Sequence, residues 1–112
     1  MDLYLVLCVC PQEIVDRIIA EILGKKLASS IDAIEDVSGL YGWQQDLVKE
    51  NEVILLMITY DQLIEDVVTN ILELHPYEMP VITYFNCDFV HFQYESWIEE
   101  KIDLDDMYKI KI

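Results

Sequence analysis

Basic residues are scarce in this chain. Its 112 residues include 22 acidic side chains against seven lysines and arginines, so the formal net charge at pH 7 is −15. Arg17 is the only arginine. A field of this sign repels phosphate backbones and anionic headgroups, so we expect no nucleic-acid partner and no membrane partner. Cations are the natural small partners, although acidic residues also serve solubility alone.

Long apolar runs and paired cysteines are missing as well. No stretch approaches the roughly 20 apolar residues of a spanning helix, and the apolar run 3–10 lacks the basic flank and small residues of a cleaved leader. Cys8, Cys10 and Cys87 show neither a disulfide framework nor the paired spacing of a zinc site. We therefore expect reduced thiols and a cytoplasmic protein.

What the chain does have is apolar surface. The hydrophobic fraction is 54%, above the ~45–50% of an average globular domain. A length of 112 residues suits a single domain, which we place at 1–112. We expect some of the apolar surface to remain for self-association.

The first half of the chain shows one helical pattern between strand patterns. Residues 3–10 form an apolar run of strand length, and apolar residues at four-residue spacing after Pro11 predict an amphipathic helix that ends near 24–28. Residues 29–43 read as a strand. The segment 44–51 is polar and turn-like before an apolar strand at 53–58, which together predict a long hairpin.

The second half repeats the helix and strand. Thr59 followed by Gln62 fits a capping box, and the expected buried stripe of this helix is Leu63, Ile64, Val67, Val68, Ile71, Leu72 and Leu74. A strand is expected at 81–85. Asp88 is the expected cap of a last helix, which carries Tyr94, Trp97, Ile98 and Ile102 on one side. The tail 103–112 adds an edge strand or frays.

This order predicts an α+β fold of the ferredoxin-like βαββαβ type, with an additional C-terminal helix. Two right-handed βαβ halves that intercalate form one antiparallel sheet with helices on one face. Because the strands are apolar on both sides, we expect the second face to pack against neighbouring subunits.

The segment 74–80, Leu-His-Pro-Tyr-Glu-Met-Pro, is the best place to look for function. Pro76 removes a backbone donor and pushes His75 out of the helical region, so the preceding helix ends there. Pro80 enters the following strand. Between the prolines, a phenol and a carboxylate are presented on a stiffened turn.

Several motifs together resemble the CutA family of divalent-cation tolerance proteins, from Leu3 to about Lys101. They are Leu7-Cys8-Val9-Cys10-Pro11, Lys26-Leu27-Ala28-Ser29-Ser30, Tyr41-Gly42-Trp43 with Glu52, Thr59, the segment 74–80, and Tyr94 with Trp97. The resemblance implies a ferredoxin-like homotrimer linked to copper or other divalent metals, without an enzymatic reaction. Cys8 and His75 match positions implicated in copper binding in bacterial relatives. This chain departs from the family pattern at Ser29, Ser30, Ile58 and Val81.

The candidate metal ligands are Cys8, His75 and Glu78. A thiolate and an imidazole suit copper or zinc, but two ligands are too few for tight binding. Glu78 or a group from a neighbouring subunit would have to complete the shell. The alternative is structural: His75 caps the helix and Cys8 fills the core.

Aromatic residues suggest an inter-subunit cleft or an interface, and we single out Tyr41, Trp43, Tyr77 and Trp97. Phosphate chemistry is disfavoured, because Arg17 lies on a solvated helix face and the three glycines form no phosphate cradle. The alternative function is a trimeric small-molecule sensor or scaffold resembling nitrogen-regulatory signal proteins. Its ligand would be neutral or cationic.

Overall fold

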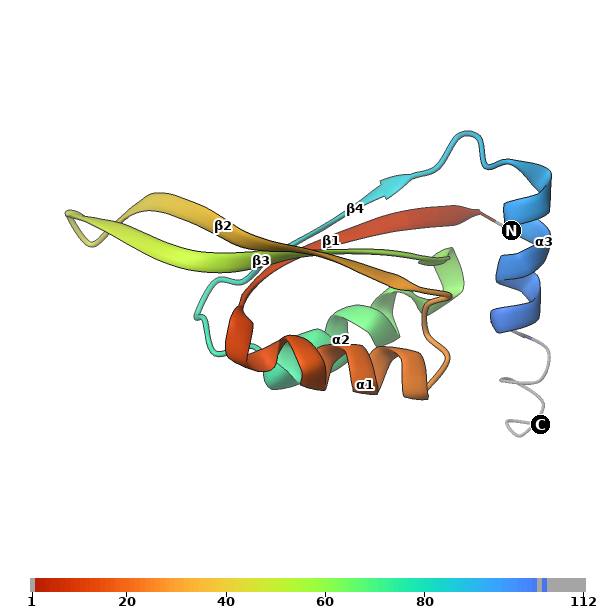
Figure 1. The fold of residues 1–112 in the computed structure, drawn as a ribbon, viewed down its shortest axis with the longest axis horizontal. Helices are drawn as coiled ribbons and strands as arrows, with labels where there is room; N and C mark the ends of the chain where they lie inside the picture. Colours follow the sequence, from red (N-terminus) through yellow and green to blue (C-terminus); the bar gives the residue numbers. More distant parts are fainter. Residues whose placement is uncertain (1, 103, 105–112) are drawn as a thin grey trace.

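The computed structural model describes residues 2–102 and 104. Its elements are β1 (Leu3–Pro11), α1 (Val15–Gly24), β2 (Ile31–Trp43), β3 (Asp46–Tyr60), α2 (Ile64–Leu74), β4 (Val81–Asn86) and α3 (Phe92–Lys101), with 3-10 turns η1 (Gln12–Ile14) and η2 (Asp61–Leu63) before α1 and α2. Helices α1 and α2 lie side by side below the sheet, and the β2–β3 hairpin projects beyond them (Figure 1). Helix α3 stands at the opposite end.

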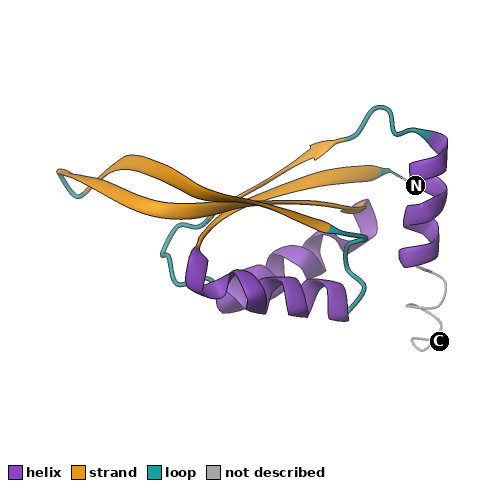
Figure 2. Ribbon diagram, in the orientation of Figure 1, coloured by secondary structure: helices purple, strands orange, loops and turns teal. Residues whose placement is uncertain are grey.

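The sheet has four antiparallel strands in the order β2-β3-β1-β4. Strand β1 is central and pairs with β3 on one side and with β4 on the other. The two strands of each βαβ half are therefore separated by one strand of the other half. Both crossover helices cover the same face of the sheet (Figure 2). The predicted ferredoxin-like fold with an extra C-terminal helix is confirmed.

The core lies between the sheet and its two crossover helices. Side chains alternate along a strand, so every second residue of the two central strands faces the helices: Val6, Cys8 and Cys10 on β1, and Val53, Leu55 and Met57 on β3. Ile18 and Ile22 of α1 and Val67 and Ile71 of α2 close the core from the other side. The alternate positions, such as Leu5, Leu7 and Leu56, are only partly buried on the uncovered face.

The hairpin is longer and its turn is tighter than the sequence predicts. Strand β3 begins at Asp46, which pairs with Trp43, so only Gln44 and Gln45 form the turn. The predicted polar loop at 44–51 is therefore wrong. Its polar residues belong to a strand that extends past the helices, where solvent reaches the side chains and an apolar run is not needed.

The predicted capping box at the second helix is also wrong. Thr59 still lies in β3, and its hydroxyl donates a 2.6 Å hydrogen bond to the carbonyl oxygen of Leu27. The N-cap position of η2 is Tyr60, without a side-chain hydrogen bond. Leu72, placed in the buried stripe by the sequence, is 50% exposed because it points away from the sheet.

Helix α3 is capped by His91 rather than by the predicted Asp88. The backbone N–H of Gln93 donates to His91 Nδ1 at 3.3 Å. Ile98 and Ile102 are buried as expected, whereas Trp97 remains partly exposed. The predicted tail 103–112 lies outside the described residues except for Leu104, which is buried. None of the described helices has the length and apolar character that crossing a bilayer requires.

Candidate functional site

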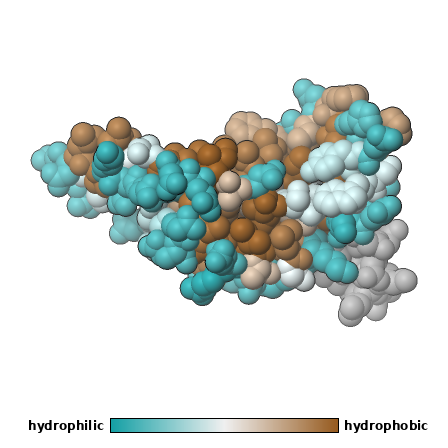
Figure 3. All heavy atoms as spheres, viewed as in Figure 1, coloured by the Kyte–Doolittle hydropathy of each residue, from teal (hydrophilic) through white to brown (hydrophobic). Residues whose placement is uncertain are grey.

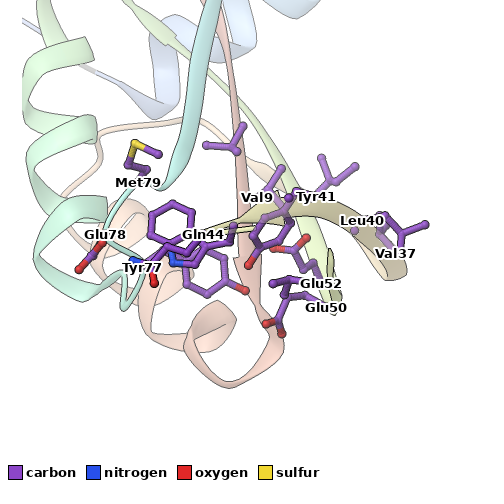
Figure 4. A pocket seen from close by; sticks show the side chains of 16 residues that line it. Val9, Val37, Leu40, Tyr41, Gln44, Glu50, Glu52, Tyr77, Glu78 and Met79 are labelled. Atoms are coloured by element: carbon purple, nitrogen blue, oxygen red, sulfur yellow. The ribbon is translucent and has the colours of Figure 1, made fainter. Parts of the chain in front are cut away.

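A pocket of about 850 Å³ opens at the base of the β2–β3 hairpin, beside the turn that follows α2 (Figure 4). Along β3 the lining positions are 48, 50, 52 and 54. Because they alternate with the buried core positions, they lie on the sheet face that α1 and α2 leave uncovered. The turn 77–79 and the strand ends at Val9 and Val81 close the pocket on its other side.

Glu52 is the most buried acidic residue of the pocket, at 6% exposure. Gly39, on the neighbouring strand β2, makes room for it: a Cβ at Gly39 would overlap Glu52 Oε1 and come within 3.1 Å of Cδ. The sole ion pair among residues 2–102 and 104 joins Lys25 to Glu21. Glu52 therefore has no cationic partner in the described part of the chain, and burial of an unpaired carboxylate is costly.

Tyr77 brings a second polar group to the same pocket. Its hydroxyl is buried beside the Glu52 carboxylate. Burial, together with the negative charge of Glu52 and Glu50, raises the pKa of Tyr77 well above its ordinary value. The pKa of Tyr41 is raised as well, by desolvation and by the same two carboxylates. Desolvation is the largest cause of both pKa shifts, and the carboxylates add to it in a pocket that has no basic lining residue.

His75 organises the turn rather than facing the pocket. Its Nε2 lies 2.8 Å from the carbonyl oxygen of Val9, to which it donates, and its Nδ1 accepts the backbone N–H of Tyr77 at 3.2 Å. The imidazole also meets the Tyr77 ring edge-on at a centroid distance of 4.7 Å. Both ring nitrogens are thus engaged within the protein, which fixes the position of Tyr77.

The predicted metal ligands do not converge within one protomer. Cys8 is fully buried in the core, where its interaction with the Cys10 thiol and burial raise its pKa and keep it protonated. Glu78 is exposed at the pocket rim. Among the residues that the structure describes, no three cysteine, histidine or acidic side chains form a group that could hold a metal ion. These residues do not fit a complete intra-subunit metal site.

The predicted aromatic group is divided between two places. Tyr41, Trp43 and Tyr77 line the pocket together with Glu78. Trp97 lies apart on α3, where it stacks on Tyr94 with ring centroids 5.9 Å apart and carries the Lys101 ammonium 5.5 Å above its ring. Only the first three of these aromatic side chains can therefore contact one ligand.

Comparison with known proteins identifies the fold family. The family model described as "CutA1 divalent ion tolerance protein" matches residues 4–101. The chain belongs to the CutA1 family. This confirms the resemblance that the motifs of the sequence indicate, including the segment that holds His75.

Other CutA proteins agree with this assignment. A CutA homolog from Danio rerio is 30% identical over 99 residues, covering 88% of this chain and 66% of the relative. A divalent-cation tolerance protein CutA from Thermus thermophilus is 29% identical over 96 residues, covering 85% and 93%. The crystal structure of CutA from Xylella fastidiosa superimposes with a TM-score of 0.86 at 25% identity, covering 92% of this chain and all of that one. The chain spans only about half of the Homo sapiens CutA that it matches.

Glu50 and Gly39 are pocket residues of this CutA1 chain that sequence reasoning missed, and the motif that contains Glu52 does not reveal that this carboxylate is buried. The acidic residues at positions 50 and 52 alternate with residues of other types, and this two-residue period is typical of a strand. The strand was not recognised because the polar segment 44–51 resembles a loop. Burial of Glu52 depends on a contact across two strands, which no local pattern reveals.

Proposed function

We propose that this chain acts as a CutA-type homotrimer in tolerance to divalent cations, in the cytoplasm and without enzymatic turnover. Membership of the CutA1 family supports the tolerance role. The net charge of −15 favours cations as ligands. Three free cysteines, two of them buried, agree with a reducing compartment.

The observation that carries the trimer is the exposed apolar surface of the sheet. On the edge strand β4, Val81, Tyr84 and Phe85 are each about half exposed, and on the other edge strand β2, Ile34 and Leu40 are exposed too. In Figure 3 apolar side chains gather over the middle of the molecule, and a smaller apolar group lies near the end of the hairpin among hydrophilic side chains. Edge strands also carry unpaired backbone N–H and C=O groups. Subunits that meet edge to edge would pair these groups and bury the exposed apolar side chains at the same time.

Metal binding in this proposal is weak and uses groups from more than one subunit. A thiol and an imidazole favour copper or another late divalent ion over magnesium or calcium. Cys8 and His75 are both occupied by protein contacts, and Glu78 alone is free at the rim. A partner chain would have to supply the remaining ligands.

Native mass spectrometry tests the proposed trimer, and copper titration tests the proposed metal ligands. We expect a trimer at micromolar concentration, and a monomer would contradict the assembly. Copper that displaces the protein contacts of Cys8 and His75 should bind more weakly to Cys8→Ser and to His75→Ala but not to Cys87→Ser, because Cys87 is not among the proposed ligands. Equal affinity in all three variants would remove Cys8 and His75 as ligands.

The pocket supports a second candidate, a trimeric small-molecule sensor or signalling scaffold. Its volume of about 850 Å³ lies within the range of small-ligand sites. A metabolite at 100 times its dissociation constant adds about 2.7 kcal/mol to the free energy of unfolding. A thermal-shift screen of metabolites should therefore give a clear hit for a sensor and none for a scaffold.

A further inference from the structure

The β2–β3 hairpin has an irregularity where it leaves the core. Strand β2 places two residues, Glu35 and Asp36, opposite the single residue Val53 of β3. Asp36 adopts the left-handed conformation, with φ at 57°. A bulge of this kind interrupts the ladder of hydrogen bonds and bends the strand. The outer hairpin, which we define as residues 37–52, therefore joins the rest of the sheet at a local bend.

The inner part of the hairpin is fixed by the helices, and the outer hairpin is not. On the core side of the bulge, Val53, Leu55 and Met57 are buried. The outer hairpin projects past α1 and α2 (Figure 1), and its only buried residue is Glu52. Glu52 is therefore the point at which the outer hairpin is held within one chain.

The turn after α2 reaches Glu52 through Tyr77. The Tyr77 hydroxyl is buried beside the Glu52 carboxylate, to which it donates a hydrogen bond. Tyr77 is itself fixed, because its backbone N–H donates to His75 Nδ1 at 3.2 Å, and Nε2 of the same ring lies 2.8 Å from the Val9 carbonyl oxygen. These contacts link the end of β1, the turn and the outer hairpin.

Glu52 contacts both strands of the outer hairpin directly beside the bulge. It pairs with Val37, the first residue of β2 beyond the bulge. Its side chain also lies over Gly39, where a Cβ would come within 3.1 Å of Glu52 Cδ. Because Tyr77 holds this side chain next to the bend, a small displacement there changes the direction of the whole outer hairpin.

We propose that the turn 75–77 is a strap that sets the angle of the outer hairpin, and that the bulge at Glu35 and Asp36 is the hinge. With the hydrogen bond between Tyr77 and Glu52 in place, the outer hairpin keeps one orientation relative to the core. When this bond breaks, the outer hairpin moves about the bulge as a unit while the core stays folded. The strap uses contacts within one chain, and it requires neither metal binding nor an occupant of the pocket.

Amide hydrogen exchange of the full chain tests the strap, at a concentration where wild type and variant have the same oligomeric mass. Tyr77→Phe removes only the hydroxyl. It should speed exchange over 38–51 about 2- to 10-fold, as expected for one hydrogen bond lost from a local opening equilibrium, and leave 53–58 unchanged. Tyr84→Phe makes the same change at a half-exposed position on β4 and should not alter exchange over 38–51. Unchanged exchange over 38–51 in Tyr77→Phe, or an equal increase over 53–58, would overturn the proposal.

A second variant tests the hinge. Deletion of Asp36 combined with Glu35→Thr leaves one residue opposite Val53, so that β2 pairs with β3 without a bulge. In the Tyr77→Phe background this change should return exchange over 38–51 most of the way to the wild-type rate, because a regular strand provides no joint for the movement. Exchange that stays as fast as in Tyr77→Phe alone would overturn the bulge as the hinge.

Discussion

At the residue scale, one imidazole ring joins the turn after α2 to the end of β1. His75 donates to the Val9 carbonyl and accepts from the Tyr77 N–H. His75→Ala leaves both groups unpaired, so we expect the free energy of unfolding to fall by about 1–3 kcal/mol. Urea denaturation measures the loss. His75→Gln can still donate to Val9 and should recover part of the stability; equal losses in the alanine and glutamine variants would contradict a hydrogen-bonding role.

Gly39 and Glu52 form a pair whose fit can be measured. The absence of a Cβ at Gly39 leaves room for Glu52 Oε1, and no described glycine has a positive φ. Gly39→Ala should therefore destabilise by overlap alone, by roughly 1–3 kcal/mol. In a Glu52→Ala background the overlap is gone, so the same change should cost less. A double-mutant cycle with a coupling below about 0.5 kcal/mol would contradict the contact.

These residues also show how far sequence reasoning reaches. The two prolines around Tyr77 predict a stiff turn, and the structure has α2 ending at Leu74 with His75 extended. The alternative that His75 caps the helix is wrong for its side chain, which bonds the carbonyl oxygen of Val9, 66 residues away in sequence, rather than a carbonyl of α2. No spacing pattern contains such a contact. The burial of Cys8, in contrast, follows directly from its place in an alternating apolar strand.

At the element scale, the β2–β3 hairpin turns through two residues poorly suited to it. Gln44 and Gln45 have φ values of 50° and 74°, the left-handed region that type I′ hairpin turns use and that asparagine and glycine prefer. The double substitution Gln44→Asn with Gln45→Gly should therefore stabilise the hairpin by about 1 kcal/mol. Slower amide hydrogen exchange along 40–49 is the expected readout. Unchanged exchange there would contradict strain at the turn.

The same turn explains why the hairpin was mispredicted. Helices and central strands are recognisable because one face must be apolar to form the core, as in α1 and β1. The outer hairpin has no such face within a protomer, and its turn lacks the asparagine–glycine signal of a two-residue loop. A bulge between Ile34 and Val37, with Asp36 at φ 57°, further interrupts the alternation. The bounds of the hairpin strands are therefore defined only by the pairing of β2 with β3.

At the scale of the whole molecule, charge and apolar surface oppose each other. Exposed apolar residues on both edge strands favour association, whereas each chain carries a net charge of −15. Subunits that associate must bring these like charges together. Cations in solution therefore act on assembly and stability in two ways, by screening the charge or by binding at defined sites.

Thermal unfolding at matched ionic strength separates the two effects. Diluting NaCl from about 0.15 M to about 0.01 M extends the Debye length from ~8 to ~30 Å, so repulsion should lower the unfolding midpoint. If divalent ions bind as proposed, ZnCl₂ or CuCl₂ should raise the midpoint above that in NaCl of equal ionic strength, and the increase should grow logarithmically with metal concentration. Coinciding midpoints would mean that the acidic surface is only screened, and the proposed divalent-cation binding would fail while the fold assignment would stand.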